Sequence, residues 1–88
     1  MRIEVRRTGG FAGIERRAAL DTTGRPDAAT WTALAEQALA AGHATPPLGV
    51  PDGFAYRITA DGRTRYCTDP HLTEPQRQLI TGVLKEGA

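Results

Sequence analysis

The sequence predicts an α+β domain in which a four-stranded antiparallel sheet carries two helices on one face, in the order β-β-α-β-β-α. Three segments alternate apolar and polar residues with the period of a strand, and a fourth is expected where the chain returns after the turn Asp61-Gly62. They fall into two pairs, each joined by a glycine-containing turn, so each pair is expected to form a hairpin. A stretch with helical periodicity follows each hairpin.

The chain of 88 residues suits a single domain over 1–88, with one modest core and little room for a deep internal pocket. Its formal net charge is +1, which argues against a general nucleic-acid binder. The single cysteine forms no internal disulfide. Because the sequence opens directly on strand-like alternation and no apolar run approaches about 20 residues, we expect a cytoplasmic bacterial protein that does not enter a membrane.

The first hairpin begins at the N-terminus, and its second strand is expected from about residue 13 to residue 21. The apolar positions of the two strands are Met1, Ile3, Val5, Ile14, Ala18 and Leu20. Arg16 falls on the apolar side, which a bulge or a strand end would explain.

The loop of this hairpin is rich in glycine and has an aromatic residue at its centre. It consists of Gly9, Gly10, Phe11, Ala12 and Gly13. An aromatic side chain at a loop tip either folds back to cap the sheet or stands in solvent for insertion into a partner. These residues alone leave both interpretations open.

The first helix is expected to begin near Pro26 and Asp27, because proline and an acidic residue favour a first helical turn. Its apolar stripe is Trp31, Leu34, Ala35, Ala38 and Ala41. Gly42 is placed to terminate the helix. Since Trp31 lies on the stripe, we expect it in the core and not in a binding site.

A proline-rich linker covers residues 43–52 and excludes helix and interior strand. It exceeds the usual connection of about 4–6 residues, so it is either functional or needed to span the distance back to the sheet. It either presents Leu48 and Val50 to solvent or lays them over the core.

The second hairpin is marked by the turn signal Asp61-Gly62, with a fourth strand over residues 63–68. The expected register places Tyr56 opposite Cys67 and Arg57 opposite Tyr66. The core-facing positions are then Phe54, Tyr56, Ile58 and Cys67. We therefore expect Cys67 to be a small buried apolar residue and not a nucleophile.

The last helix begins at a predicted capping box in which Thr73 and Gln76 flank a first-turn proline. Its inward stripe is Leu79, Ile80, Val83 and Leu84. Lys85 occupies the last turn and Gly87 ends the helix. The second face of the sheet would then lie in water with Arg2, Arg6, Arg17, Arg57 and Thr59.

Residues for catalysis or metal binding are not found together. His43 and His71 lie in separate loops without metal-ligand spacing, and serine is absent from the chain. No helix follows the glycine-rich loop, so a phosphate site is not indicated there. We expect no catalytic residue, no metal site and no cofactor, and an enzyme is the least favoured class.

The sequence resembles the emfourin family, small bacterial inhibitors of thermolysin-like (protealysin-type) zinc metalloproteases. The segments that carry the resemblance are Met1-Arg2-Ile3-Glu4-Val5, Gly9-Gly10-Phe11-Ala12-Gly13-Ile14, Leu20-Asp21 and Pro51-Asp52-Gly53-Phe54-Ala55-Tyr56, together with the central and final helices. The resemblance implies a protein partner, a thermolysin-like metalloprotease whose active-site cleft is blocked. The free inhibitor would be a monomer, and it would stay in the cytoplasm or leave with its target protease.

The candidate partner-binding residues are Gly9, Gly10, Phe11, Ala12, Gly13, Ile14, Leu48 and Val50. Our hypothesis is that the glycine-rich loop enters the cleft with Phe11 or Ile14 in the apolar pocket that such proteases place next to the scissile bond. An inhibitor of this kind needs no chemistry of its own, only a segment that fills the cleft and resists cleavage.

Two other classes remain open from the residues. A small interaction or regulatory domain could use the arginine-bearing sheet face to hold an acidic partner other than a protease. A nucleic-acid module would use Arg2, Arg6, Arg17, Arg57, Arg63 and Arg65. The near-neutral total charge and the lack of a basic helix disfavour that second class, so no nucleic-acid partner is expected.

Overall fold

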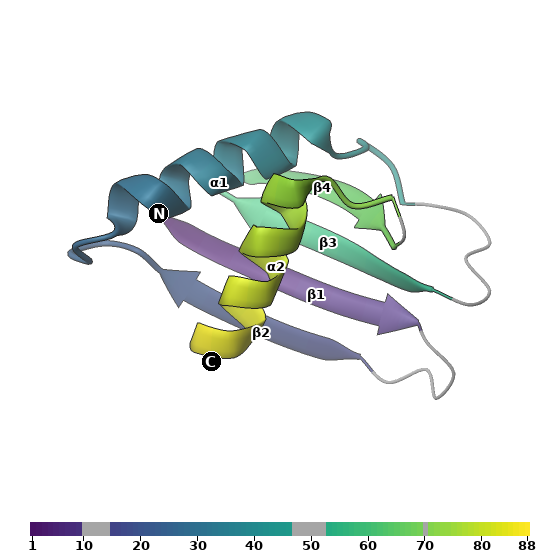
Figure 1. Ribbon diagram of the computed structural model, residues 1–88. Coiled ribbons are helices and arrows are strands. Elements are labelled where there is room, and N and C mark those ends of the chain that lie inside the picture. The colour runs from purple at the N-terminus through teal and green to yellow at the C-terminus, as the bar shows by residue number, and fades with distance from the viewer. Residues whose placement is uncertain (10–14, 47–52, 70) are drawn as a thin grey trace.

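A computed structural model of the chain describes residues 1–9, 15–46, 53–69 and 71–88. The elements in chain order are β1 (Arg2–Gly9), β2 (Arg16–Asp21), α1 (Ala28–Ala41), β3 (Phe54–Ala60), β4 (Arg63–Thr68) and α2 (Glu74–Glu86). The strands form one antiparallel sheet in the order β2-β1-β3-β4, and both helices lie on the same face of it (Figure 1). The predicted α+β fold and element order are confirmed.

The core lies between this sheet and the two helices. The strands contribute Ile3, Val5, Ala18, Leu20, Tyr56, Ile58, Ala60 and Cys67. The helices contribute Trp31, Ala35, Ala38, Leu39, Leu79, Ile80, Val83 and Leu84. Because side chains alternate between the faces of a strand, the buried positions on each strand follow the predicted period of two.

The buried stripe of α1 differs from the predicted one at its C-terminal end. Leu39 is buried, whereas Ala41 is exposed. With about 3.6 residues per turn, Leu39 lies beside Ala35 and Ala38, and Ala41 lies on the flank of the helix. In a helix this rich in alanine, the sequence gives little contrast between faces.

The C-terminal end of α1 is at Gly42, as predicted, whereas its N-terminal end differs from the prediction. The helix begins at Ala28 after Asp27, so Pro26 precedes it instead of lying in its first turn. The Asp27 carboxylate accepts hydrogen bonds from Arg25 Nε at 2.9 Å and Trp31 Nε1 at 3.0 Å. Gly42 ends the helix with an extended backbone, and a Cβ atom there would lie 2.6 Å from Arg65 Cβ, so close packing requires the glycine.

The predicted capping box of α2 is confirmed. Thr73 Oγ1 accepts from the Gln76 N–H at 3.2 Å, and Gln76 Oε1 accepts from the Thr73 N–H at 2.9 Å. The Gln76 side chain is also buried and its Nε2 donates to the Ala38 carbonyl oxygen at 3.2 Å. One side chain therefore caps α2 and joins it to α1.

The second hairpin has the predicted register, with Tyr56 opposite Cys67. Its turn residues Asp61 and Gly62 both have positive φ, 53° and 74°, as a tight two-residue turn requires. In the first hairpin, β2 begins at Arg16, later than the predicted residue 13. Residues 10–14 lie outside the described residues.

Both edge strands have a short backbone partner. On β2, Ala19 and Ala88 exchange hydrogen bonds of 3.2 and 3.1 Å, and on β4, His43 and Tyr66 exchange bonds of 2.8 and 2.9 Å. These contacts occupy backbone groups that an edge strand would otherwise offer to another chain. None of the helices in the described ranges has the length and apolarity needed to span a membrane.

Candidate functional site

One end of the sheet anchors both segments that were expected to contact a partner. Gly9 at the end of β1 lies directly opposite Phe54 at the start of β3. The chain therefore leaves toward residues 10–14 and returns from residues 47–52 at the same end of the sheet (Figure 1). Seven of the eight candidate residues lie outside the described residues: Gly10, Phe11, Ala12, Gly13, Ile14, Leu48 and Val50.

Gly9, the remaining candidate, is the last residue of β1 and not part of a loop. Its φ is +98°, a conformation that side-chain-bearing residues rarely adopt. A Cβ atom at this position would lie 2.7 Å from the Gly53 carbonyl oxygen. Glycine is required at position 9 because the end of β1 lies very close to the backbone of Gly53, just before β3.

Asp69, after β4, reinforces this end of the sheet. Its backbone N–H donates to the Phe54 carbonyl oxygen at 3.1 Å, and its carboxylate accepts from the Tyr56 hydroxyl at 3.3 Å. Burial raises the pKa of Tyr56, and the neighbouring Asp69 charge adds to the effect, so the hydroxyl remains a donor. Phe54, the first residue of β3, is thus held by its pairing with β1 and by the backbone of Asp69 beyond β4.

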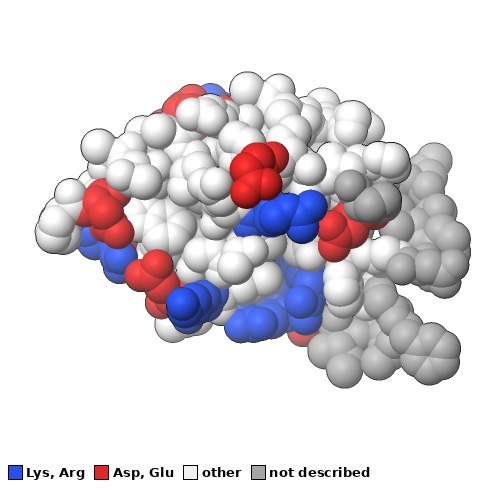
Figure 2. Space-filling model, in the orientation of Figure 1, with Lys and Arg blue, Asp and Glu red and all other residues white. Residues whose placement is uncertain are grey.

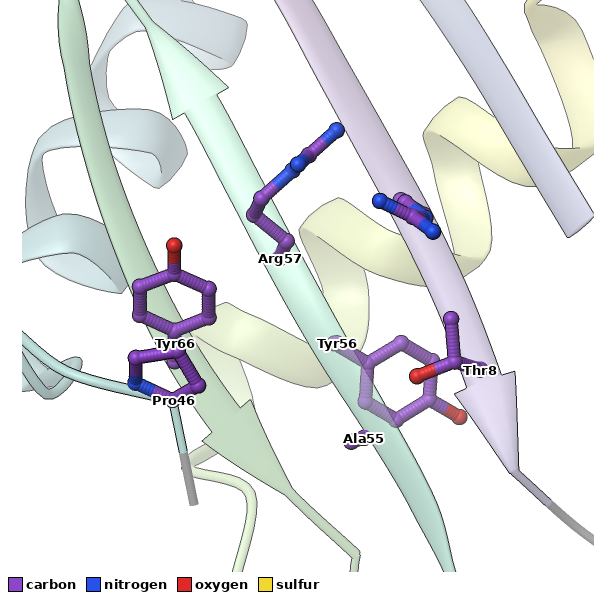
Figure 3. Close-up of a pocket in the computed structure, with 7 residues that line it drawn as sticks. Thr8, Pro46, Ala55, Tyr56, Arg57 and Tyr66 are labelled. Carbon is purple, nitrogen blue, oxygen red and sulfur yellow. The ribbon is translucent and has the colours of Figure 1, made fainter. Parts of the chain in front are cut away.

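On the exposed face of the sheet, a hollow of about 320 Å³ lies near the same end (Figure 3). Its lining comes from three strands and from the segment after α1: Arg6, Thr8, Pro46, Ala55, Tyr56, Arg57 and Tyr66. Arg6 pairs with Glu15 at 2.6 Å, and Arg57 lies 3.7 Å from Glu4. Carboxylates of the same chain therefore offset much of the positive charge on this face.

The strand register divides the arginines between the two faces of the sheet. Arg17, Arg6 and Arg57 lie opposite one another on the exposed face, as predicted. Arg63 and Arg65 lie opposite the core residues Ala60 and Ile58 and are on the helix-bearing face. The six arginines considered for a nucleic-acid module therefore do not share one surface.

The helix-bearing face has a second cleft at the same end, with a volume of about 430 Å³. It is lined by Arg7, Arg16, Tyr56, Ile80, Thr81, Leu84 and Lys85. Arg7 and Arg16 are direct cross-strand neighbours. Figure 2 shows Lys and Arg side chains in the lower half of this face, with Asp and Glu side chains beside them.

Arg16 and Arg7 have specific contacts with the scaffold. Arg16 donates to the Leu84 carbonyl oxygen at 2.6 Å, near the C-terminus of α2, where a cation is favoured. The Arg7 guanidinium carbon lies 4.5 Å from the centre of the Phe54 ring. The sequence pattern marked Arg16 as out of place, but Arg7 was missed although it shares the parity of the core residues Ile3 and Val5.

The structure places the cysteine weighed for catalysis in the core and the two histidines on the surface. Cys67 is buried as predicted, and burial raises the pKa of its thiol to about 11. His43 and His71 are exposed. Among the described residues, no group of three or more His, Cys, Asp or Glu side chains is arranged to hold a metal ion.

A comparison with protein-family models matches the emfourin model over residues 5–84. No curated protein and no solved structure shows significant similarity to the chain. The matched range contains all of α1, β2, β3 and β4 and most of β1 and α2. With nearly the whole fold inside one family model, the chain belongs to the emfourin family, whose members are protease-inhibitor-type domains.

Proposed function

We propose that this protein inhibits thermolysin-like zinc metalloproteases by inserting residues of its two candidate segments into the active-site cleft. Membership of the emfourin family supports a protease as partner. The observation that carries the proposal is the pairing of Gly9 with Phe54, because it brings the anchors of both segments to one end of the sheet. A partner at that end would meet both segments together.

The size of the domain favours the use of both segments. Protease–inhibitor pairs typically bury about 800 Å² per partner. The whole chain exposes 5343 Å², so such an interface needs roughly 15% of its surface. One short loop is too small to supply this area, whereas two neighbouring segments and the residues at their base could do so.

The proposed chemistry is that of a blocked cleft. A catalytic zinc site keeps one coordination position open for water or substrate, and an inhibitor acts by occupying the space around it. Anchors fixed by the sheet reduce the conformational entropy that a binding segment loses in the complex. Phe11 and Ile14 are the apolar side chains proposed for the pocket beside the scissile bond.

The test is the inhibition constant of the purified full chain against a thermolysin-like protease. We expect Phe11→Ala or Ile14→Ala to weaken inhibition by roughly tenfold or more, as loss of a buried apolar anchor does. Leu48→Ala and Val50→Ala test whether the second segment, residues 47–52, also contributes to inhibition. Thr30→Ala, at an exposed position near the opposite end of α1, is the matched control and should leave the constant unchanged.

Failure of the wild-type chain to inhibit any thermolysin-like protease would refute the proposal. It would favour the alternative of an interaction domain with another partner. Unchanged inhibition by both Phe11→Ala and Ile14→Ala would exclude the first segment as the anchor, although the inhibitory function would stand.

A further inference from the structure

We propose that the cleft formed by Arg7, Arg16 and Lys85 on the helix-bearing face is a subsite for a carboxylate side chain of the target protease. This inference rests on the proposed function, because it assigns a contact to the same complex. In the sequence, the cleft residues Arg7 and Arg16 stand on either side of the first candidate segment, residues 9–14. Arg7 is two residues before Gly9, and Arg16 is two residues after Ile14.

The position of the cleft follows from the strand register. A strand rises about 3.3 Å per residue, so two residues correspond to about 7 Å along the sheet. A protease that engages residues 10–14 would therefore have part of its surface within reach of Arg7 and Arg16. Lys85 comes from the last turn of α2 and lines the same cleft.

The charge of the cleft is unbalanced within the described part of the chain. Arg7 and Arg16 are directly opposite each other, an arrangement in which like charges repel. In residues 1–9, 15–46, 53–69 and 71–88, no carboxylate forms an ion pair with either arginine or with Lys85. This separates the cleft from the exposed sheet face, where Glu4 and Glu15 pair with arginines.

The two arginines keep hydrogen-bonding capacity for a ligand. Each guanidinium has five N–H groups in a planar fork that matches a carboxylate. Arg16 uses one terminal nitrogen for the Leu84 carbonyl oxygen, and Arg7 uses the face of its guanidinium against Phe54. The Nε of Arg7 is buried and has no hydrogen-bond partner in the described residues.

The rest of the lining suits an acidic side chain and not a free phosphate in water. Ile80 and Leu84 provide apolar surface for the methylene groups, and Thr81 provides a hydroxyl group, whereas the Tyr56 hydroxyl already donates to Asp69. Apolar walls exclude water and strengthen a charge-assisted hydrogen bond. A glutamate or aspartate at the rim of a protease cleft has methylene groups for the apolar walls and a carboxylate for the arginines.

The experiment compares three single variants of the full chain that each remove one positive charge. We expect Arg7→Gln to raise the inhibition constant roughly ten- to a hundredfold, as loss of a hydrogen bond to a charged group does. Lys85→Gln, at the exposed rim, should raise it about threefold. Arg2→Gln is the matched control, because Arg2 is exposed at the far end of β1 and does not line the cleft.

The salt dependence adds a readout that a packing role would not produce. Added sodium chloride should weaken inhibition by the wild type more steeply than inhibition by Arg7→Gln, because screening acts on the charge pair. Neutralising the matching acidic residue of the protease should reproduce the loss and should not add to that of Arg7→Gln. Equal constants and equal salt slopes for all three variants would overturn the proposal.

Two controls keep the result interpretable. Because Arg7 packs on Phe54, its variant must retain the wild-type thermal transition; if it does not, Lys85→Gln alone decides the result.

Asp52 is the one acidic residue outside the described ranges. If Asp52→Asn raises the constant as much as Arg7→Gln and the two changes are not additive, the carboxylate belongs to this chain and the proposal is wrong. If the wild-type chain does not inhibit the protease, both the proposed function and the subsite are refuted. If Phe11→Ala weakens inhibition but Arg7→Gln and Lys85→Gln do not, only the subsite is refuted.

Discussion

Gly9→Ala should be more damaging than Gly24→Ala or Gly42→Ala, and its cost can be separated into two parts. A side chain at φ +98° introduces backbone strain of about 1–2 kcal/mol. The new methyl group would also lie 2.7 Å from the Gly53 carbonyl oxygen, which is backbone and cannot rotate away. Overpacking of this kind adds about 1–3 kcal/mol, so we expect a total of about 3 kcal/mol.

Two other glycines isolate the separate contributions. Gly24 has a similar φ of +80° but nothing within 4 Å of an added Cβ, so Gly24→Ala should cost about 1 kcal/mol from strain alone. Gly42 has an ordinary φ of −82°, but its Cβ would lie 2.6 Å from Arg65 Cβ. Gly42→Ala should therefore show the packing cost without the strain, about 1–2 kcal/mol.

The assay is urea and thermal denaturation of the three variants, followed by the inhibition constant of each. In a domain of this size, 1 kcal/mol corresponds to roughly 4–8 °C in Tm, so Gly9→Ala should melt about 15 °C below the wild type. It should also weaken inhibition, because it moves the anchors of both candidate segments, whereas Gly24→Ala should not. A Gly9→Ala variant as stable as Gly24→Ala would show that the close approach to Gly53 costs nothing and would refute the reasoning.

Three further predictions concern single side chains. Gln76→Ala should lower the free energy of unfolding by about 2–3 kcal/mol in urea, whereas exposed Gln78→Ala should change it by less than about 0.5 kcal/mol; equal effects would contradict the role of the buried cap. The Arg25 hydrogen bond lowers the pKa of Asp27 below its ordinary 3.8, so this carboxylate stabilises the fold above that pH and the contribution is lost as the pH falls through the folded-state pKa. The Tm difference between wild type and Asp27→Asn should therefore shrink between about pH 6 and pH 2, and a constant difference would contradict this. Burial raises the pKa of Cys67 to about 11, so a thiol reagent at about pH 8 should label the native protein far more slowly than the unfolded chain, and equal rates would contradict the burial.

Local signals made most of the fold predictable. The Asp61-Gly62 turn fixes the pairing of β3 with β4, because a two-residue turn leaves one register, and the observed register is the predicted one. The Thr73 capping box likewise fixes the start of α2. The pairing of β1 with β3 joins residues far apart in sequence. That pairing depends on how the two hairpins pack under the helices, and no local residue pattern encodes it.

The candidate site was less predictable, because its charges are placed by tertiary contacts. Arg16 broke the apolar pattern of its strand, and its reason is a helix end 68 residues later in the chain. Arg7 broke the pattern in the same way on β1, but at the end of a strand such a residue is easily assigned to solvent. The two became one cleft only when the cross-strand register and the last turn of α2 were known.

The end of the sheet that anchors the candidate segments is the part of the scaffold with the most constraints. Residue 54 is paired with β1, accepts from the Asp69 backbone and packs under the Arg7 guanidinium. Each contact narrows the directions in which the neighbouring segments leave the sheet. A small inhibitor gains affinity chiefly by reducing the entropy lost on binding, and a rigid base achieves this without enlarging the interface. The same contacts hold Arg7 beside the first segment, so in this fold the rigidity of the anchor and the placement of the charge have one structural origin.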